Sequence, residues 1–420
     1  GEDDAQEERR LRIALVEMRE HETRRHEEEV DLDRDTEVGG RLAADRIQGH
    51  RAVSYDMFSE SPVENFATTM TTHHRSNKPV SELADAEGYY RPRVGDLLKE
   101  RYITINIAGQ GVFSTVVRAK STSDNSEVAI KIIRNNEVMQ KAAQKEILIL
   151  KTLKERDPDD KKHCVRLLDN FMHCGHTCLV FESLQMNLRE VLRKYGVGRG
   201  ISMQGVRLYA RQLLFALHLM AKCNLVHADL KPDNILINAE KTRVKVCDFG
   251  SASFAEADCD ITPYLVSRFY RAPEIILGLP YDRAIDMWSL GCCLYELYTG
   301  KVAFPGRTNN EMLRFFQEMR GAVPSRMVRR AQFRSLHFTD DCKFRQAEYN
   351  NVNRTEITKI VTFTNKPKVE LKDLILRAAE TDEQKTAVLL ADLLDKMFTL
   401  EPVKRVTVSE ALQHPFFTTR

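Results

Sequence analysis

The sequence predicts an α+β protein with two unequal lobes, a small β-rich lobe followed by a larger α-helical lobe. Apolar and polar residues alternate in short runs within 102–133, and two further strand-like runs end at Phe181. These runs indicate about five strands and one helix. After Glu182 the apolar residues recur with helical spacing, in 205–220, 285–298 and 309–319. Strands followed by helices are typical of α+β folds, so we place the boundary between the lobes near residue 182.

We expect residues 1–88 to lie outside both lobes. Residues 7–34 mix Glu, Arg, His and Asp with a thin apolar stripe, which fits either a lone polar helix or a solvated coil. The prediction is therefore a charged, largely disordered N-terminal extension over 1–88, a β-rich lobe over 89–182 and a helical lobe over 183–420.

Composition excludes several classes of protein. The 420 residues carry 63 basic and 61 acidic side chains, a net charge of +2, which favours neither bulk nucleic-acid binding nor attachment to a membrane surface. No apolar run approaches the roughly 18–20 residues of a membrane span, and the charged N-terminus lacks the apolar segment of a secretory signal. The nine cysteines are scattered, so we expect reduced thiols, as in the cytosol or nucleus.

The tightest group of potential metal ligands is His173, Cys174, His176 and Cys178. Strand-like runs flank this group and Gly175 lies at its centre. A β-hairpin turn is favoured over a zinc site, because four ligands on one tight hairpin would not readily close a tetrahedron.

A glycine-containing stretch, Gly109-Gln110-Gly111-Val112-Phe113-Ser114, lies between two strand patterns. Glycines at this spacing let backbone amides approach phosphate groups without interference from a Cβ. Ser114 stands where a third glycine is expected and is small enough to fit. The motif is weak evidence by itself. It gains force from Val128-Ala129-Ile130-Lys131, which places Lys131 on the third strand, where it can face the same phosphates; a solvent-exposed lysine is the alternative.

A lysine that binds phosphates needs an acidic partner. The predicted helix over 137–154 has Val138, Ala142, Ile149 and Leu153 on roughly one face, and Glu146 falls on that apolar face. An unpaired carboxylate would be unusual there, so Glu146 is the favoured partner of Lys131. Glu137 is the competitor, but it starts the helix, where the helix dipole already explains an acidic residue.

The strongest signal is His227-Ala228-Asp229-Leu230-Lys231-Pro232-Asp233-Asn234, followed by Asp248-Phe249-Gly250. Phosphoryl transfer needs a carboxylate to accept or orient the proton of the attacking hydroxyl, a cation near the moving phosphoryl group, and ligands for Mg²⁺. We assign the first role to Asp229, the second to Lys231, and the binding of Mg²⁺ to Asn234 and Asp248.

The segment Phe181-Glu182-Ser183-Leu184 is predicted to link the lobes and to offer backbone groups to an adenine ring. Apolar walls are expected from Val116, Ala129 and Leu236, with Phe181 at the back. The full set of residues predicted to contact ATP is Ala108, Gly109, Gln110, Gly111, Val112, Phe113, Ser114, Thr115, Val116, Ala129, Lys131, Phe181, Glu182, Leu184 and Leu236.

The residues between Asp248 and Ala272-Pro273-Glu274 have the length of an activation segment. Tyr264 precedes Arg268 and Arg271 by four and seven residues, so a phosphate on Tyr264 would gain charge-assisted hydrogen bonds from both; an unmodified surface tyrosine is the alternative. Three further contacts are expected to hold the site together: Ser267 with Asp229 and Lys231, Glu274 with a buried Arg405, and Asp286 with the backbone of the catalytic loop.

These motifs, in this order over residues 101–417, resemble a eukaryotic protein kinase. The activation segment and a long insert at 306–390 in the helical lobe are similar to those of the CMGC group, which includes the MAP, cyclin-dependent, DYRK and CDC-like kinases. Four stretches together resemble the family of the spliceosomal pre-mRNA-processing factor four kinase, namely 85–90, 186–192, 227–229 and 260–271.

The resemblance implies the bilobal kinase fold and transfer of the γ-phosphate of ATP, with Mg²⁺, to Ser and Thr side chains. It further implies self-phosphorylation on Tyr264, a nuclear location, and spliceosomal protein substrates with Ser-Pro, Thr-Pro or arginine/serine-rich segments. We expect a monomer that binds neither nucleic acid nor membrane directly. Ala228 departs from the pattern, because most kinases carry there an arginine that binds activation-segment phosphate, which leaves Arg268 and Arg271 for that role.

A catalytically silent pseudokinase that docks spliceosomal or signalling proteins is the alternative function. Such proteins usually lack an equivalent of Lys131, Asp229 or Asp248, and this chain has all three, so an active enzyme is favoured. Residues 1–88 could serve as a docking arm, and the basic residues of the insert could bind acidic partners, although solvated surface is favoured for both. Those basic residues are Arg326, Arg329, Arg330 and Arg334.

Overall fold

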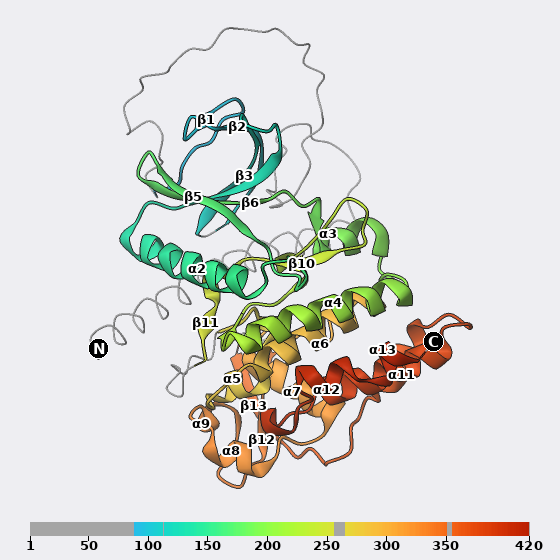
Figure 1. Cartoon of the computed structure of the whole chain (residues 1–420). Coiled ribbons are helices and arrows are strands. Elements are labelled where there is room, and N and C mark those ends of the chain that lie inside the picture. The colour runs from blue at the N-terminus through green and yellow to red at the C-terminus, as the bar shows by residue number, and fades with distance from the viewer. Residues whose placement is uncertain (1–87, 112, 256–264, 351–354, 420) are drawn as a thin grey trace, which may run out of the picture. The chain divides into compact units, whose positions relative to one another are not determined.

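A computed structural model of the chain describes residues 88–111, 113–255, 265–350 and 355–419 (Figure 1). The predictions for the N-terminal extension, for Val112 and for Tyr264 fall outside the described residues. Within the described residues the chain divides into two compact units, 88–147 with Leu167–Ser183, and Leu148–Arg166 with 184–419. The first unit is built on a β-sheet and the second is mainly helical, which confirms the predicted α+β class.

The first unit contains a curled antiparallel sheet of six strands in the order β1-β2-β3-β4-β6-β5 (Figure 1). Its strands are Leu97–Leu98 (β1), Tyr102–Gln110 (β2), Ser114–Ser121 (β3), Glu127–Ile133 (β4), Leu167–His173 (β5) and His176–Glu182 (β6). Alternate residues such as Val117, Ile130 and Val180 form the buried core on one face. The turn between β5 and β6 is the predicted hairpin, with Cys174 and Gly175 at φ of 49° and 82°, as a two-residue turn of this kind requires.

Helix α2 (Glu137–Arg156) begins in the first unit and ends in the second. The Asn136 side chain accepts a hydrogen bond from the Met139 amide at 2.8 Å and so caps the helix start. Its fully buried stripe contains Met139, Ala143, Glu146, Ile147 and Leu150. The expected positions Val138 and Ala142 are only half-buried, so the first two turns are rotated by one residue relative to the prediction.

The second unit is built on eleven described helices. They are α3 (Leu188–Val191), α4 (Met203–Lys222), α5 (Pro273–Leu277), α6 (Ala284–Thr299), α7 (Asn309–Arg320), α8 (Ser325–Arg330), α9 (Arg334–His337), α10 (Leu371–Ala378), α11 (Gln384–Met397), α12 (Val408–Leu412) and α13 (Pro415–Thr418). The predicted helices over 205–220, 285–298 and 309–319 are confirmed as α4, α6 and α7. Helix α6 is buried along nearly its whole length, and Trp288 packs against Phe304, Phe316 and Phe398. None of the helices in the described part of the chain is long and apolar enough to cross a membrane.

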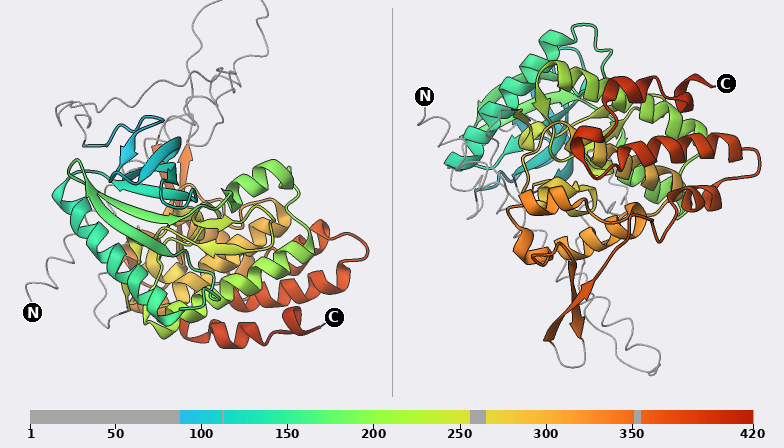
Figure 2. Two further views of the ribbon diagram at one scale, coloured as in Figure 1. Left: turned by 45° about the horizontal axis from the view of Figure 1, so that its top comes forward. Right: turned by 90° about the horizontal axis from the view of Figure 1, so that it is seen from below.

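Short strands position the loops of the second unit. Strands β7 (Met186–Asn187), β9 (Ile235–Ile237) and β10 (Val244–Val246) form one sheet, and β8 (Leu225–Val226) pairs with β11 (Ser253–Phe254). The predicted insert contains a hairpin of β12 (Phe344–Asn350) and β13 (Thr355–Val361), which projects from the helices (Figure 2, right). Two of the basic residues in the insert are ion-paired, Arg326 with Glu401 and Arg334 with Asp340.

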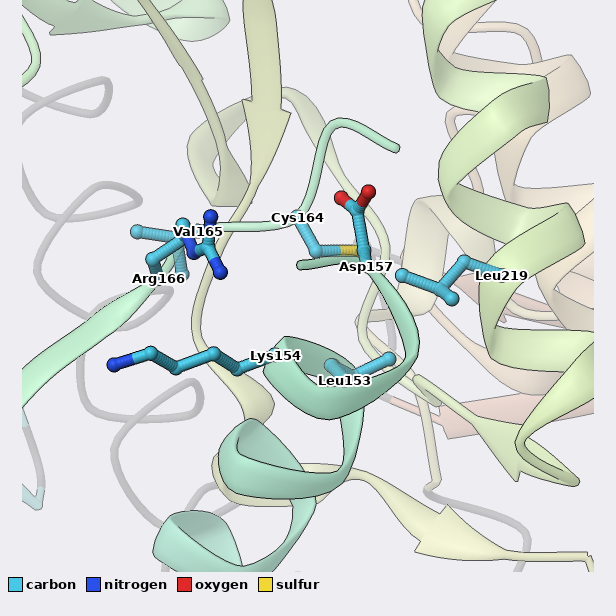
Figure 3. Close-up of a pocket in the computed structure, with 7 residues that line it drawn as sticks. All are labelled: Leu153, Lys154, Asp157, Cys164, Val165, Arg166 and Leu219. Carbon is cyan, nitrogen blue, oxygen red and sulfur yellow. The ribbon is translucent and has the colours of Figure 1, made fainter. Parts of the chain in front are cut away.

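The connection from α2 to β5 is anchored within the second unit. The Val165 amide donates to the Val246 carbonyl at 2.9 Å, and the Val246 amide donates to the His163 carbonyl at 2.8 Å. The connection therefore extends the sheet along the edge of β10. Figure 3 shows the small hollow beside it, where side chains from the end of α2 and from the connection meet Leu219 of α4.

Candidate active site

The first unit holds the predicted pair of Lys131 and Glu146. The Lys131 ammonium lies 2.8 and 2.9 Å from the two Glu146 carboxylate oxygens, and the side chains are only 14% and 4% exposed. The competitor Glu137 is 83% exposed and pairs with Lys141 instead. Because β4 carries Lys131 and α2 carries Glu146, the pair fixes the lysine ammonium at a defined point on the sheet.

Most residues predicted to contact ATP lie on the first unit, and several share one face of its sheet. Val116 pairs with Lys131 across β3 and β4, and Ala129 pairs with Phe181 across β4 and β6. Paired residues point to the same face, so these four side chains lie opposite the apolar core. Leu184 and Leu236 belong to the second unit.

The glycine-containing stretch forms the turn between β2 and β3. Ala108, Gly109 and Gln110 end β2, whereas Ser114, Thr115 and Val116 begin β3. The Gly111 amide donates to the Ser114 carbonyl at 2.9 Å and closes the turn. A Cβ on Gly111 would meet no atom within 4 Å, so packing within the fold does not require glycine at this position.

The catalytic loop, residues 227–234, follows β8 and is anchored by Asp286 of α6. The amides of His227 and Ala228 donate to the two carboxylate oxygens of Asp286 at 2.7 and 3.0 Å, as predicted. Burial raises the pKa of Asp286, and the nearby His227 and the two amide hydrogen bonds partly offset this effect. Ala228 has φ of 61°, which costs energy in a residue with a Cβ and marks a loop whose conformation the surroundings impose.

The Asp229 carboxylate is oriented by three side chains. Asn234 donates from Nδ2 to one carboxylate oxygen at 3.1 Å, and Lys231 lies 3.1 Å from the same oxygen. Ser267 donates from Oγ to the other oxygen at 2.7 Å and accepts from the Lys231 ammonium at 3.0 Å. The predicted contact of Ser267 with Asp229 and Lys231 is therefore present.

Asn234 and Asp248 stand at the same end of the β9–β10 pair. Ile235 pairs with Val246, and the Cys247 amide donates to the Asn234 carbonyl at 3.0 Å. Asp248 has φ of 59° and begins the turn Phe249–Ser251. Because Asn234 donates through Nδ2, its Oδ1 is oriented as an acceptor. Carboxylate and amide oxygens suit Mg²⁺, so this donor set fits the predicted ion.

The described end of the activation segment is anchored by Arg271. Its guanidinium donates to the Leu265 and Val266 carbonyls at 2.9–3.2 Å and to Asn309 at 2.6 Å. Val266 has φ of 70°, a strained value for a β-branched residue. These contacts were not predicted. The binding of a phosphate on Tyr264 by Arg268 and Arg271 stays a prediction.

A partly buried cluster around Arg189 was not predicted from the sequence. This arginine of α3 contacts Asp233 of the catalytic loop, Glu296 of α6 and Tyr270. The only sequence signal was an acidic residue, Asp233, directly before the metal-binding candidate Asn234. Nothing local indicated its partner, because 44 residues separate Arg189 from Asp233.

Comparison with known families agrees with this geometry. The model of the family described as protein kinase domain matches residues 102–417. The chain belongs to the protein kinase family. The match includes every residue that we assign to catalysis, and it confirms the kinase fold predicted from the motifs.

Individual relatives indicate which group of protein kinases this chain belongs to. It is 45% identical over 370 residues to the serine/threonine-protein kinase prp4 of Schizosaccharomyces pombe, covering 86% of the chain and 77% of that protein. It is 41% identical to the serine/threonine-protein kinase prpf4B of Dictyostelium discoideum, covering 86% of the chain and 47% of the relative. It is 36% identical to the human dual specificity protein kinase CLK2, covering 79% of the chain and 67% of that protein.

These relatives confirm the predicted resemblance to a CMGC kinase of the Prp4 type, and they are named as serine/threonine or dual-specificity kinases. The predicted class of enzyme is thereby confirmed. The chain spans less than half the length of the Dictyostelium relative, although it spans most of the fission-yeast protein.

Proposed function

We propose that this kinase transfers the γ-phosphate of Mg·ATP to Ser and Thr hydroxyls of proteins. The observation that carries the proposal is the Asp229 carboxylate, which Ser267, Lys231 and Asn234 hold in one orientation. An acceptor hydroxyl that donates to this carboxylate is oriented by it and has a base for its proton. Lys231 balances negative charge on the transferred group.

Residues of the first unit provide the proposed contacts with the nucleotide phosphates. The Lys131 ammonium, held by Glu146, is suited to bind the α- and β-phosphates. Gly111 supports this assignment, since the open space at its Cβ position would admit a phosphate close to the backbone. Asn234 and Asp248 are the proposed ligands of Mg²⁺, which when bound would neutralise phosphate charge.

Geometry next to Ser267 supports acceptors followed by proline. Ser267 contacts Asp229, and the proposal puts the substrate residue after the acceptor beside the preceding Val266. The Val266 carbonyl accepts two hydrogen bonds from Arg271, from Nε at 3.2 Å and Nη2 at 2.9 Å. A substrate backbone N–H would find that carbonyl occupied and would lose a hydrogen bond, whereas proline has no N–H to satisfy.

The resemblance to kinases of the Prp4 type extends the proposal to nuclear splicing proteins as the substrates. Self-phosphorylation on Tyr264, with Arg268 and Arg271 as phosphate ligands, and action as a monomer belong to the same proposal. Direct binding of nucleic acid is not part of it.

The test measures phosphate incorporation from Mg·ATP into the purified chain and into matched Ser-Pro and Ser-Ala peptides, with Asp248→Ala beside the wild type. We expect incorporation that falls by at least about a hundredfold in the variant, a preference for the Ser-Pro peptide, and Tyr264 among the mapped sites. No incorporation into itself, into these peptides or into arginine/serine peptides, despite measurable nucleotide binding, would support the docking pseudokinase instead.

A further inference from the structure

The Arg189 guanidinium is enclosed by acidic and phenolic groups of the second unit. It donates to Glu296 and to the Tyr270 hydroxyl, and its Nε and Nη2 lie 3.4 and 3.3 Å from an Asp233 carboxylate oxygen. Tyr270 in turn donates to Glu296 at 2.6 Å. Burial lowers the pKa of Arg189, but Tyr270, Asp233 and Glu296 outweigh this effect and hold it above the usual value.

This cluster lies beside the proposed acceptor site. Asp233 directly precedes Asn234, which donates to Asp229, and Tyr270 follows Ser267, which also donates to Asp229, by three residues. The Ser289 hydroxyl donates a hydrogen bond to the Tyr270 carbonyl at 2.8 Å and so holds the backbone of Tyr270 in place. A substrate whose hydroxyl reaches Asp229 therefore passes close to Asp233.

Only part of the cluster can be reached from solvent. Glu296 and Tyr270 are buried, whereas the Asp233 side chain is 30% exposed and the Arg189 side chain 25% exposed. An exposed carboxylate next to an acceptor site would attract an arginine of the substrate, because a guanidinium forms strong charge-assisted hydrogen bonds with carboxylates. In this chain the Asp233 carboxylate is already paired with the Arg189 guanidinium.

We propose that Arg189 determines specificity by occupying the acidic site that a basic substrate side chain would otherwise fill. This inference rests on the proposed function and deepens it. The kinase then selects its acceptor by the proline that follows and gains little from arginines that precede it. Ser-Pro and Thr-Pro segments are thereby favoured over arginine/serine-rich segments.

The test uses one Ser-Pro peptide with either Arg or Ala at each of the three positions before the serine. The quantity compared is the ratio of kcat/KM for the Arg peptide to that for the Ala peptide. We expect ratios within about threefold of one for the wild type. Arg189→Gln should raise the ratio at least about tenfold at one position or more, and adding Asp233→Asn should return it to near one. Arg193→Gln, which removes an exposed charge one helical turn away, is the matched control and should leave the ratio unchanged.

Two results would overturn the inference. One is a wild type that favours the Arg peptide tenfold or more and loses this preference in Asp233→Asn. The other is a folded Arg189→Gln protein whose ratio stays at the wild-type value. Should Arg189→Gln fail to fold, Arg189→Lys replaces it, because a single ammonium cannot hold Glu296 and Asp233 as the guanidinium does; the ratio should then rise, and a folded Arg189→Lys protein with the wild-type ratio would overturn the inference. The same ratios measured as peptide Kd separate this inference from a failure of the proposed phosphoryl transfer.

Discussion

Arg405 and Glu274 form a bidentate ion pair in which neither side chain is exposed to solvent. The guanidinium nitrogens lie 2.7 and 2.9 Å from the two carboxylate oxygens, and Arg405 also donates to the Ala284 carbonyl at 2.7 Å. The pair joins α5, at the end of the activation segment, to the turn Pro402–Lys404 near the C-terminus. The sequence predicted this pair because a buried glutamate needs a cation.

Removal of either partner should destabilise the protein strongly. Arg405→Met and Glu274→Gln should each lower the free energy of unfolding by roughly 3–5 kcal/mol, because each leaves a buried polar or charged group without its partner. The double variant should lose clearly less than the sum of the two. Urea unfolding of the four proteins in a double-mutant cycle measures this coupling, and single losses under about 1 kcal/mol would contradict the buried bidentate pair.

Glu146→Gln should impair catalysis far more than Glu137→Gln. The change removes the charge that holds the Lys131 ammonium, so we expect kcat/KM for ATP to fall by about a hundredfold. Glu137 is exposed and contacts only the surface residue Lys141 in its ion pair, and its variant serves as the control. Equal rates for the two variants in a steady-state assay would show that the ion pair of Lys131 is not needed.

Ser267→Ala should lower kcat without changing the KM for ATP. The Ser267 hydroxyl links Asp229 to Lys231. Because its loss removes a hydrogen bond from both the carboxylate and the ammonium, their positions become less well defined, and we expect kcat to fall by about tenfold to a hundredfold. Ser267→Thr retains the hydroxyl and should recover most of the rate. A changed KM for ATP together with an unchanged kcat would contradict this role.

His337 should make the stability depend on pH in the acidic range. Burial lowers the pKa of His337 to about 4, and the Nδ2 group of Asn310 lies 3.2 Å from Nδ1, where it can donate only to a neutral ring. The folded state therefore favours the neutral form. The stabilisation is complete above the unfolded pKa of about 6.5 and is lost as the pH falls toward 4, a change of roughly 3 kcal/mol.

The measurement compares thermal unfolding of the wild type and His337→Phe between pH 4 and 7.5. The difference in stability between them should shift in favour of the variant as the pH falls. A difference that stays constant over this range would show that His337 titrates normally.

Much of the active site was predictable because its chemistry is local in the chain. Asp229, Lys231 and Asn234 lie within six residues, so their motif already implied that they share one loop, and the Lys131–Glu146 pair followed from a carboxylate on an apolar helix face. Local pattern was less reliable on α2, where Met139 and Ala143 are buried in place of Val138 and Ala142. Apolar spacing alone leaves the rotation of a helix uncertain by one residue.

The α+β class, the order of the catalytic motifs and the residue types proposed to bind phosphate and metal could all be read from the amino-acid sequence, because these depend on composition, periodicity and short spacings. The contacts of Arg189 with Asp233, Glu296 and Tyr270, and of Arg271 with the Val266 carbonyl, became apparent only in the folded molecule. Those contacts join segments far apart in the chain or depend on one strained backbone angle. Packing of the whole second unit sets both, and no local pattern of residues encodes them.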